Sequence, residues 1–248
     1  MLTWAVYNAV PKAGEGGVPT FDFIVCATKN IPDVPPTAAS LISPAVTPKQ
    51  TVIVLAQNGL NIEKPFIEAF PANVVISAIV LMGAHELDSG NIVQDDKDIM
   101  RFGPFTNPNL DPKVGKEATE EFIRLYSAGG IAKCELNLNV GYERWRKLIY
   151  NSSWNPICAI TGMDTSRLRY AKHAIDDLVR PAMEEIKEAA KAKGFELPDE
   201  VVQATIDIDP IEVFLKPSMQ TDMQKVCRFF TTVAVANVRI DRGSADFE

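Results

Sequence analysis

The stretch FDFIVCAT at residues 21–28 is a short and almost continuous run of side chains that favour β-structure. Such a run is typical of a parallel strand that is covered on both faces of its sheet. The stretch TVIVLA at residues 51–56 and residues 74–82 repeat the pattern, and residues 62–70 between them have a helical composition. Because strands that alternate with helices indicate βαβ units, the first half of the chain predicts an α/β fold with a mainly parallel sheet.

Further elements are predicted before residue 140. The alternation in residues 91–105 favours antiparallel additions to the sheet, residues 116–127 have the pattern of an amphipathic helix, and residues 134–139 favour another short strand. Directly after the second parallel strand, Asn58-Gly59 favours a tight turn, because both residue types tolerate positive φ.

The second half of the chain predicts helices only. Residues 142–160 form the first, and Pro156 is expected to kink or end it, because proline cannot donate to the carbonyl of Ser152. Further helices are predicted over residues 166–193, 198–206 and 217–226. The change of pattern predicts two domains, residues 1–139 and 140–226, and a different tail at 227–248, whose β-like residues 231–235 have no obvious sheet to join.

The composition excludes several classes of protein. With 46% apolar and 23% charged residues in 248, the chain is long and apolar enough for a sizeable core. The net charge of −7 argues against a general nucleic-acid binder, although a local basic pocket for a small anionic substrate remains compatible with it. The longest apolar run, residues 74–84, is shorter than the roughly 20 residues that span a membrane.

Localisation and metal content follow from similar observations. The N-terminus has no signal-like leader, and the four cysteines form no CxxC pair, which predicts a reduced cytoplasmic protein. Two histidines, His85 and His173, do not make a cluster of spaced ligands, so no metal site is predicted.

The strongest chemical signal is Lys147, Asn151 and Asn155, whose i, i+4, i+8 spacing places them on one face of a helix. A lysine supplies a cation and a transferable proton, and asparagine supplies donors and acceptors, so the three could hold and protonate a polar ligand. The alternative is a solvated helix face. Asparagine is a poor helix former and Asn155 precedes Pro156, and both observations favour a functional role.

Three more candidates follow strands or begin helices. Lys29 and Asn58 come directly after predicted parallel strands, and ligands of open α/β sheets collect at the carboxyl ends of strands. Ser218, four residues before Asp222, is a binding candidate whose alternative role is helix N-capping. The glycine-rich residues 14–17 are interpreted as a surface turn and not a phosphate loop, because no helix follows them.

Taken together, these segments resemble the ketopantoate reductase (2-dehydropantoate 2-reductase) family over roughly residues 20–225. The segments that carry the resemblance are residues 21–29, AQNG at 56–59, WRKL at 145–148 with Asn151 and Asn155-Pro156, and PSM at 217–219 with Asp222.

The resemblance implies an oxidoreductase that uses NADPH to reduce the ketone of ketopantoate, giving pantoate for pantothenate and coenzyme A biosynthesis. It implies a Rossmann-type domain, a helical substrate and dimerisation domain like the C-terminal domain of 6-phosphogluconate dehydrogenase, and a homodimer. By the same resemblance, Lys147 is the general acid, and Asn151, Asn155 and Ser218 bind substrate. Asn58 contacts substrate and cofactor, and Lys29 contacts the cofactor.

The sequence departs from the family at both ends. The family begins with a strand, a glycine-rich turn, a helix and a second strand, whereas the match here starts near residue 20, and Phe230 stands where the family has an acidic cofactor contact. We therefore expect a partial Rossmann-type domain without its glycine loop, and weak or no activity. The alternatives are a non-catalytic binding or scaffold protein, or a reductase of a different 2-oxo acid.

Overall fold

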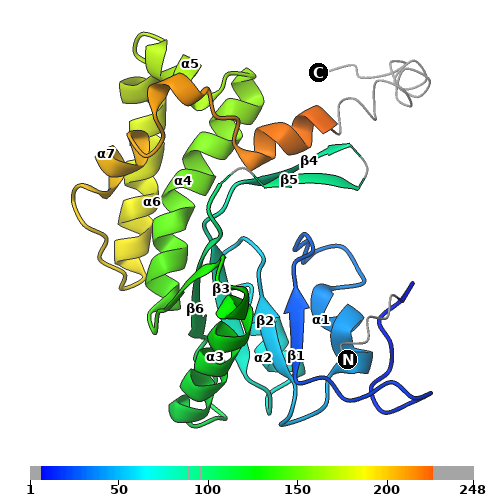
Figure 1. Ribbon diagram of the computed structural model, residues 1–248. Helices are drawn as coiled ribbons and strands as arrows, with labels where there is room; N and C mark the ends of the chain where they lie inside the picture. The colour runs from blue at the N-terminus through cyan, green and yellow to red at the C-terminus, as the bar shows by residue number, and fades with distance from the viewer. Residues whose placement is uncertain (1–6, 89, 95, 226–248) are drawn as a thin grey trace, which may run out of the picture. The chain divides into compact units, whose positions relative to one another are not determined.

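The computed structural model describes residues 7–88, 90–94 and 96–225, so the predicted tail at 227–248 lies outside the described residues. The chain forms two compact units, with the boundary between Arg144 and Trp145. Figure 1 labels helices and strands of both units. The sequence predicted a division after residue 139, where helix α4 begins at Val140. The first turn of that helix belongs to unit 1, because Arg144 is bonded to residues of the sheet and its loops.

Unit 1 is built on a five-stranded sheet. Its strands, in spatial order, are β1 (Phe23–Cys26), β2 (Val52–Leu55), β3 (Val75–Val80), β6 (Ile99–Pro104) and β7 (Lys133–Leu136). Strands β1, β2 and β3 are parallel, β6 is antiparallel to β3, and β7 is parallel to β6. The α/β fold with a parallel-dominated sheet is thus confirmed. Cys26 lies opposite Leu55, so the loops that follow β1 and β2 leave the sheet at the same edge.

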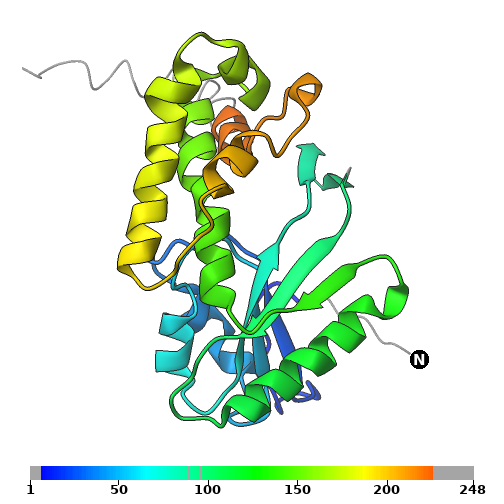
Figure 2. The ribbon, with the colours of Figure 1, turned by 90° about the vertical axis from the view of Figure 1, so that its left-hand side faces the viewer.

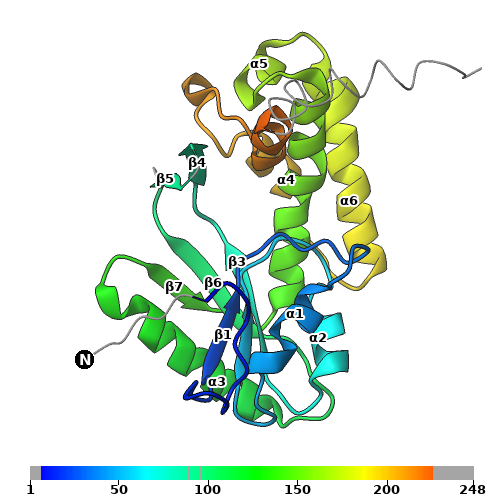
Figure 3. The ribbon, with the colours of Figure 1, turned by 90° about the vertical axis from the view of Figure 1, so that its right-hand side faces the viewer.

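Helices cover both faces of this sheet, as Figure 3 shows. Helices α1 (Ala38–Ile42) and α2 (Lys64–Ala69) pack on the face that carries Ile53 and Leu55. Helix α3 (Pro112–Tyr126) packs on the opposite face, which carries Val54 and Phe102, because successive side chains of a strand point to opposite faces. Full burial of each of these apolar side chains contributes about 1.5–3 kcal/mol. Because both faces of the sheet are covered, the strands carry continuous apolar runs.

The antiparallel addition to the sheet predicted within residues 91–105 is confirmed for β6, which pairs with β3. It is wrong for β5 (Asn91–Gln94), which pairs with β4 (Ala84–Asp88) in a separate two-stranded antiparallel sheet. Strand β4 was not predicted. Short 3-10 helices at Ser43–Ala45 and Ser127–Gly129 complete unit 1. Within the described residues, no helix has both the length and the apolar character needed to cross a membrane.

Unit 2 is helical, as predicted, and α6 runs beside α4 in it (Figure 2). Its elements are α4 (Val140–Thr161, with its first turn in unit 1), α5 (Thr165–Tyr170), a π-helical turn (Ile175–Val179), α6 (Arg180–Ala192), α7 (Val201–Ile206), a 3-10 turn (Ile211–Val213) and helical residues 218–225.

The helix predicted over residues 142–160 is confirmed, since α4 runs from Val140 to Thr161. Of the two effects expected of Pro156, ending the helix is excluded, because the buried packing of neighbours such as Trp154 and Cys158 outweighs the hydrogen bond that proline removes. The single helix predicted over residues 166–193 was wrong: the chain leaves the helical conformation near His173, which has a φ of 71°, and the π-helical turn that follows runs directly into α6.

Candidate functional site

The first group of predicted site residues lies where β1 and β2 end. We call Gln57-Asn58-Gly59, directly after β2, the Asn58 corner. The buried Gln57 side chain donates from Nε2 to the carbonyl oxygen of Thr28 at 2.8 Å and to its Oγ1 at 3.1 Å. This joins the loop after β2 to the loop after β1, which carries Lys29. Lys29 and Asn58, both exposed, therefore follow adjacent strands at the same sheet edge, as the sequence predicted.

The turn at this corner depends on glycine. Gly59 has a φ of 130°, a conformation that L side chains rarely adopt. A Cβ atom at this position would lie 2.6 Å from Cγ2 of Ile62, so a larger residue would move the turn. The Asn-Gly signal thus marks a backbone turn that Gly59 makes possible.

Arg144 holds the same corner from the side of α4. Its Nη1 atom donates to the carbonyl oxygen of Gln57 at 3.1 Å and to that of Gly59 at 2.9 Å. These two carbonyls bracket Asn58 on either side. Arg144 was not predicted from the sequence, and no local pattern reveals it, because Gln57 and Gly59 lie more than eighty positions away along the chain.

A buried ion pair fixes the Arg144 guanidinium. Its Nε atom lies 2.6 Å from Oε1 of Glu63 and 2.8 Å from Oγ of Ser77, and the Ser77 hydroxyl donates to Glu63 at 2.6 Å. The arginine and glutamate side chains are 5% and 0% exposed. Burial lowers the pKa of Arg144, and the Glu63 carboxylate opposes that shift. We call Arg144, Glu63 and Ser77 the Arg144 network.

The second group of predicted residues lies on α4 in unit 2. Lys147, Asn151 and Asn155 belong to this one helix, so their common face follows from its period. Asn155 is buried with 6% exposure, and Lys147 and Asn151 are half-buried. A wholly solvated face is therefore excluded for Asn155. A polar amide at this depth needs hydrogen-bond partners.

Ser218 begins the helical residues 218–225 and is exposed. The segment before it is held to α5, because the Thr165 N–H donates to the Leu215 carbonyl at 3.1 Å and the Phe214 N–H donates to Ser166 Oγ at 3.1 Å. The Thr221 N–H donates to the carbonyl of Pro217 at 3.2 Å, which places Pro217, not Ser218, before the first turn. Ser218 thus stands inside the helix start and not at its cap position.

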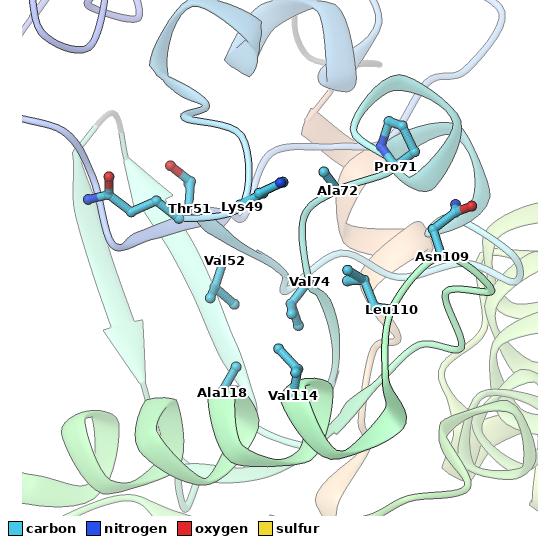
Figure 4. A pocket seen from close by; sticks show the side chains of 11 residues that line it. Lys49, Thr51, Val52, Pro71, Ala72, Val74, Asn109, Leu110, Val114 and Ala118 are labelled. Carbon is cyan, nitrogen blue, oxygen red and sulfur yellow. The ribbon is translucent and has the colours of Figure 1, made fainter.

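A cavity of about 540 Å³ lies at the other end of the sheet (Figure 4). Val52, Val74 and Val114 point toward one another in it, at the amino ends of β2 and β3 and the start of α3. Ligands of open α/β sheets bind at the carboxyl ends of strands, so this apolar cavity is not the predicted site. The glycine-rich residues 14–17 form an exposed turn, closed by a hydrogen bond from the Gly14 N–H to the Val18 carbonyl, and β1 follows them.

Comparison with protein families gives matches in both units. The model "Ketopantoate reductase PanE/ApbA" matches residues 6–107, and the model "Ketopantoate reductase PanE/ApbA C terminal" matches residues 139–228. An uncharacterized protein of Saccharomyces cerevisiae is 33% identical over 89% of this chain and 65% of its own length. A 2-dehydropantoate 2-reductase of Nostoc is 27% identical over 90% of this chain and 66% of its own length.

Solved structures also match this chain. The 2-dehydropantoate 2-reductase from Methylococcus capsulatus superposes with a TM-score of 0.65 at 27% identity, over 84% of this chain and 64% of that one. A D-mandelate dehydrogenase, solved with NADH and anilino(oxo)acetate, has a TM-score of 0.67 at 19% identity, over 83% of this chain and 64% of that one, which is a likeness of fold alone. The chain thus spans slightly less than two thirds of the length of these relatives.

Proposed function

The chain belongs to the ketopantoate reductase PanE/ApbA family, and we propose that it carries the substrate-side machinery for the NADPH-dependent reduction of ketopantoate to pantoate, a step of pantothenate and coenzyme A biosynthesis. The family consists of oxidoreductases that use a nicotinamide cofactor. The observation that carries the proposal is the array of Lys147, Asn151 and Asn155 on α4, inside the segment that the C-terminal family model matches.

In this proposal Lys147 is the general acid. NADPH supplies the hydride when it is bound, and negative charge then develops on the oxygen of the substrate ketone. A lysine ammonium stabilises that charge mainly in the transition state and donates the proton that completes the alcohol. Asn151, Asn155 and Ser218 offer amide and hydroxyl groups that hold the carboxylate and hydroxyl of the substrate.

In this proposal, residues of unit 1 bind the cofactor. The exposed carboxamide of Asn58 and the ammonium of Lys29 follow neighbouring parallel strands, where open α/β sheets bind nucleotides, and their chemistry suits a nicotinamide amide and a phosphate. Residues 1–139 then form a partial Rossmann-type NADP-binding domain and residues 140–226 the substrate and dimerisation domain of a cytoplasmic homodimer.

The test compares Lys147→Ala with the matched control Lys172→Ala, an exposed lysine of the same unit. Ketopantoate binding is followed by titration calorimetry and NADPH oxidation by absorbance. Loss of the proton donor is expected to lower turnover about 10²–10⁴-fold, while the control keeps wild-type turnover. A wild-type chain that binds neither ketopantoate nor NADPH, or a Lys147→Ala variant with unchanged turnover, overturns the proposal and favours a scaffold role.

A second candidate is reduction of a different 2-oxo acid. The fold is shared with a D-mandelate dehydrogenase solved with NADH and anilino(oxo)acetate, and the family motifs fix the ketone chemistry better than they fix the substrate. A panel of aliphatic and aromatic 2-oxo acids, assayed with NADPH and with NADH, separates the two candidates. Higher turnover of an aromatic acid than of ketopantoate would select the second.

A further inference from the structure

We propose that Arg144 is a positioning residue for Asn58: its guanidinium fixes the backbone on both sides of Asn58 and so presents that side chain in one orientation. The catalytic consequence rests on the function proposed above for Asn58. The ordering of the Asn58 corner does not rest on that function, and it can be measured by itself.

The geometry of the guanidinium matches the corner. The Nη1 atom carries two hydrogens, and two carbonyl oxygens, those of Gln57 and Gly59, lie 3.1 and 2.9 Å from it. The Gln57 carbonyl belongs to the same peptide group as the Asn58 nitrogen, so this bond fixes the peptide plane that leads into Asn58. The Gly59 carbonyl fixes the chain just after it.

The other edge of the guanidinium is anchored independently. Its Nε atom faces Glu63 and Ser77, which come from the start of α2 and from β3. A planar guanidinium meets both sets of partners at once because its donors form a rigid fork. An ammonium is a single point charge on a flexible stem, so Lys at position 144 would not reproduce the arrangement.

A second bond holds the corner from the opposite side. The Gln57 amide donates to Thr28, at the end of β1, while its backbone carbonyl accepts from Arg144. The main chain beside Asn58 is therefore tied to two different elements, whereas the Asn58 side chain itself is exposed. Rigid backbone with an exposed side chain is the arrangement expected of a group that must meet a ligand in one orientation.

Stability alone does not account for this network. In the described part of the chain, Oε2 of Glu63 and Nη2 of Arg144 are buried without a hydrogen-bond partner. A buried ion pair with unmet bonding capacity is often no more stable than apolar side chains of similar volume. The contribution of Arg144 therefore lies in the geometry that it imposes on the Asn58 corner.

The experiment replaces the whole network by apolar side chains, with Arg144→Met, Glu63→Leu and Ser77→Ala combined. Amide hydrogen exchange of residues 57–60 and the separate values of kcat and KM are compared with wild type. We expect the triple variant to remain folded, to exchange these amides faster, and to lose about 10²-fold in kcat with KM close to wild type. The single variant Arg144→Lys should also exchange the amides of residues 57–60 faster than the wild type does.

Asn73→Ala is the matched control. The buried Asn73 side chain also binds two carbonyls, those of Thr47 and Thr51, at 2.9 and 2.8 Å, but it lies at the other end of the sheet. Its loss should lower the melting temperature and leave exchange at residues 57–60 and kcat unchanged. Unchanged exchange in the triple variant, or faster exchange with wild-type kcat, overturns the positioning role. A wild type that neither turns over nor binds ketopantoate or NADPH overturns the proposed function instead, and the exchange result then still decides whether Arg144 orders the corner.

Discussion

The two groups of candidate site residues are held in place by different means. In unit 1 the Asn58 corner is fixed by bonds between segments far apart in sequence, from Thr28, Glu63, Ser77 and Arg144. In unit 2 Lys147, Asn151 and Asn155 share one helix, and the helical period alone sets their common face. The comparison teaches that a site on one helix depends on local geometry, whereas a site on a loop depends on the stability of the core beneath it.

The largest expected difference between the two groups is in stability. Glu63→Ala leaves the buried Arg144 charge without its partner, and such a change costs about 3–5 kcal/mol of the free energy of unfolding. Glu117→Ala is the control, because Glu117 pairs with Lys113 on the exposed surface of α3, where a pair contributes at most about 1 kcal/mol. Urea denaturation of both variants measures the difference, and equal losses would contradict the importance of the buried pair.

The difference between local patterns and long-range contacts also explains which features the sequence predicted. The continuous apolar runs of β1, β2 and β3 and the spacing of Lys147, Asn151 and Asn155 are local patterns, and both were read from the sequence. Strand β4 was not, because its residues 84–88 lack a continuous apolar run. The position of Arg144 against the Asn58 corner depends on packing across the whole of unit 1, which no spacing along the chain encodes.

A pH experiment separates the two units through their buried thiols. Burial raises the pKa of Cys26, in β1, to about 11 and that of Cys158, in α4, to about 12. An unfolded thiol ionises near its ordinary value of 9, while the folded Cys26 keeps its proton. The stabilisation is therefore complete below pH 9 and is lost as pH rises toward 11, by at most about 2 kcal/mol.

The measurement is the free energy of unfolding between pH 8 and about pH 11, for the wild type and for Cys26→Ala, with the pH range set by the Cys26 pKa. The variant should lose less stability over this range.

Alkylation of each thiol then reports the local opening of its own unit, and Glu63→Ala should accelerate the labelling of Cys26 but not of Cys158. Equal acceleration at both thiols would mean that the two units unfold as one.

The smallest expected effect belongs to the helical group. Alanine has a higher helix propensity than asparagine, so Asn151→Ala should leave stability unchanged or raise it by about 0.5 kcal/mol. Under the proposed function the same variant loses a hydrogen bond to substrate, and about 1 kcal/mol of lost binding raises KM roughly fivefold. Thermal unfolding and steady-state kinetics measure the two effects together. A destabilised Asn151→Ala variant would place this residue among the structural contacts of unit 2, as Glu63 is in unit 1. An unchanged or more stable variant with weaker substrate binding would confirm that the helix carries Asn151 for a ligand, at some cost to its own propensity.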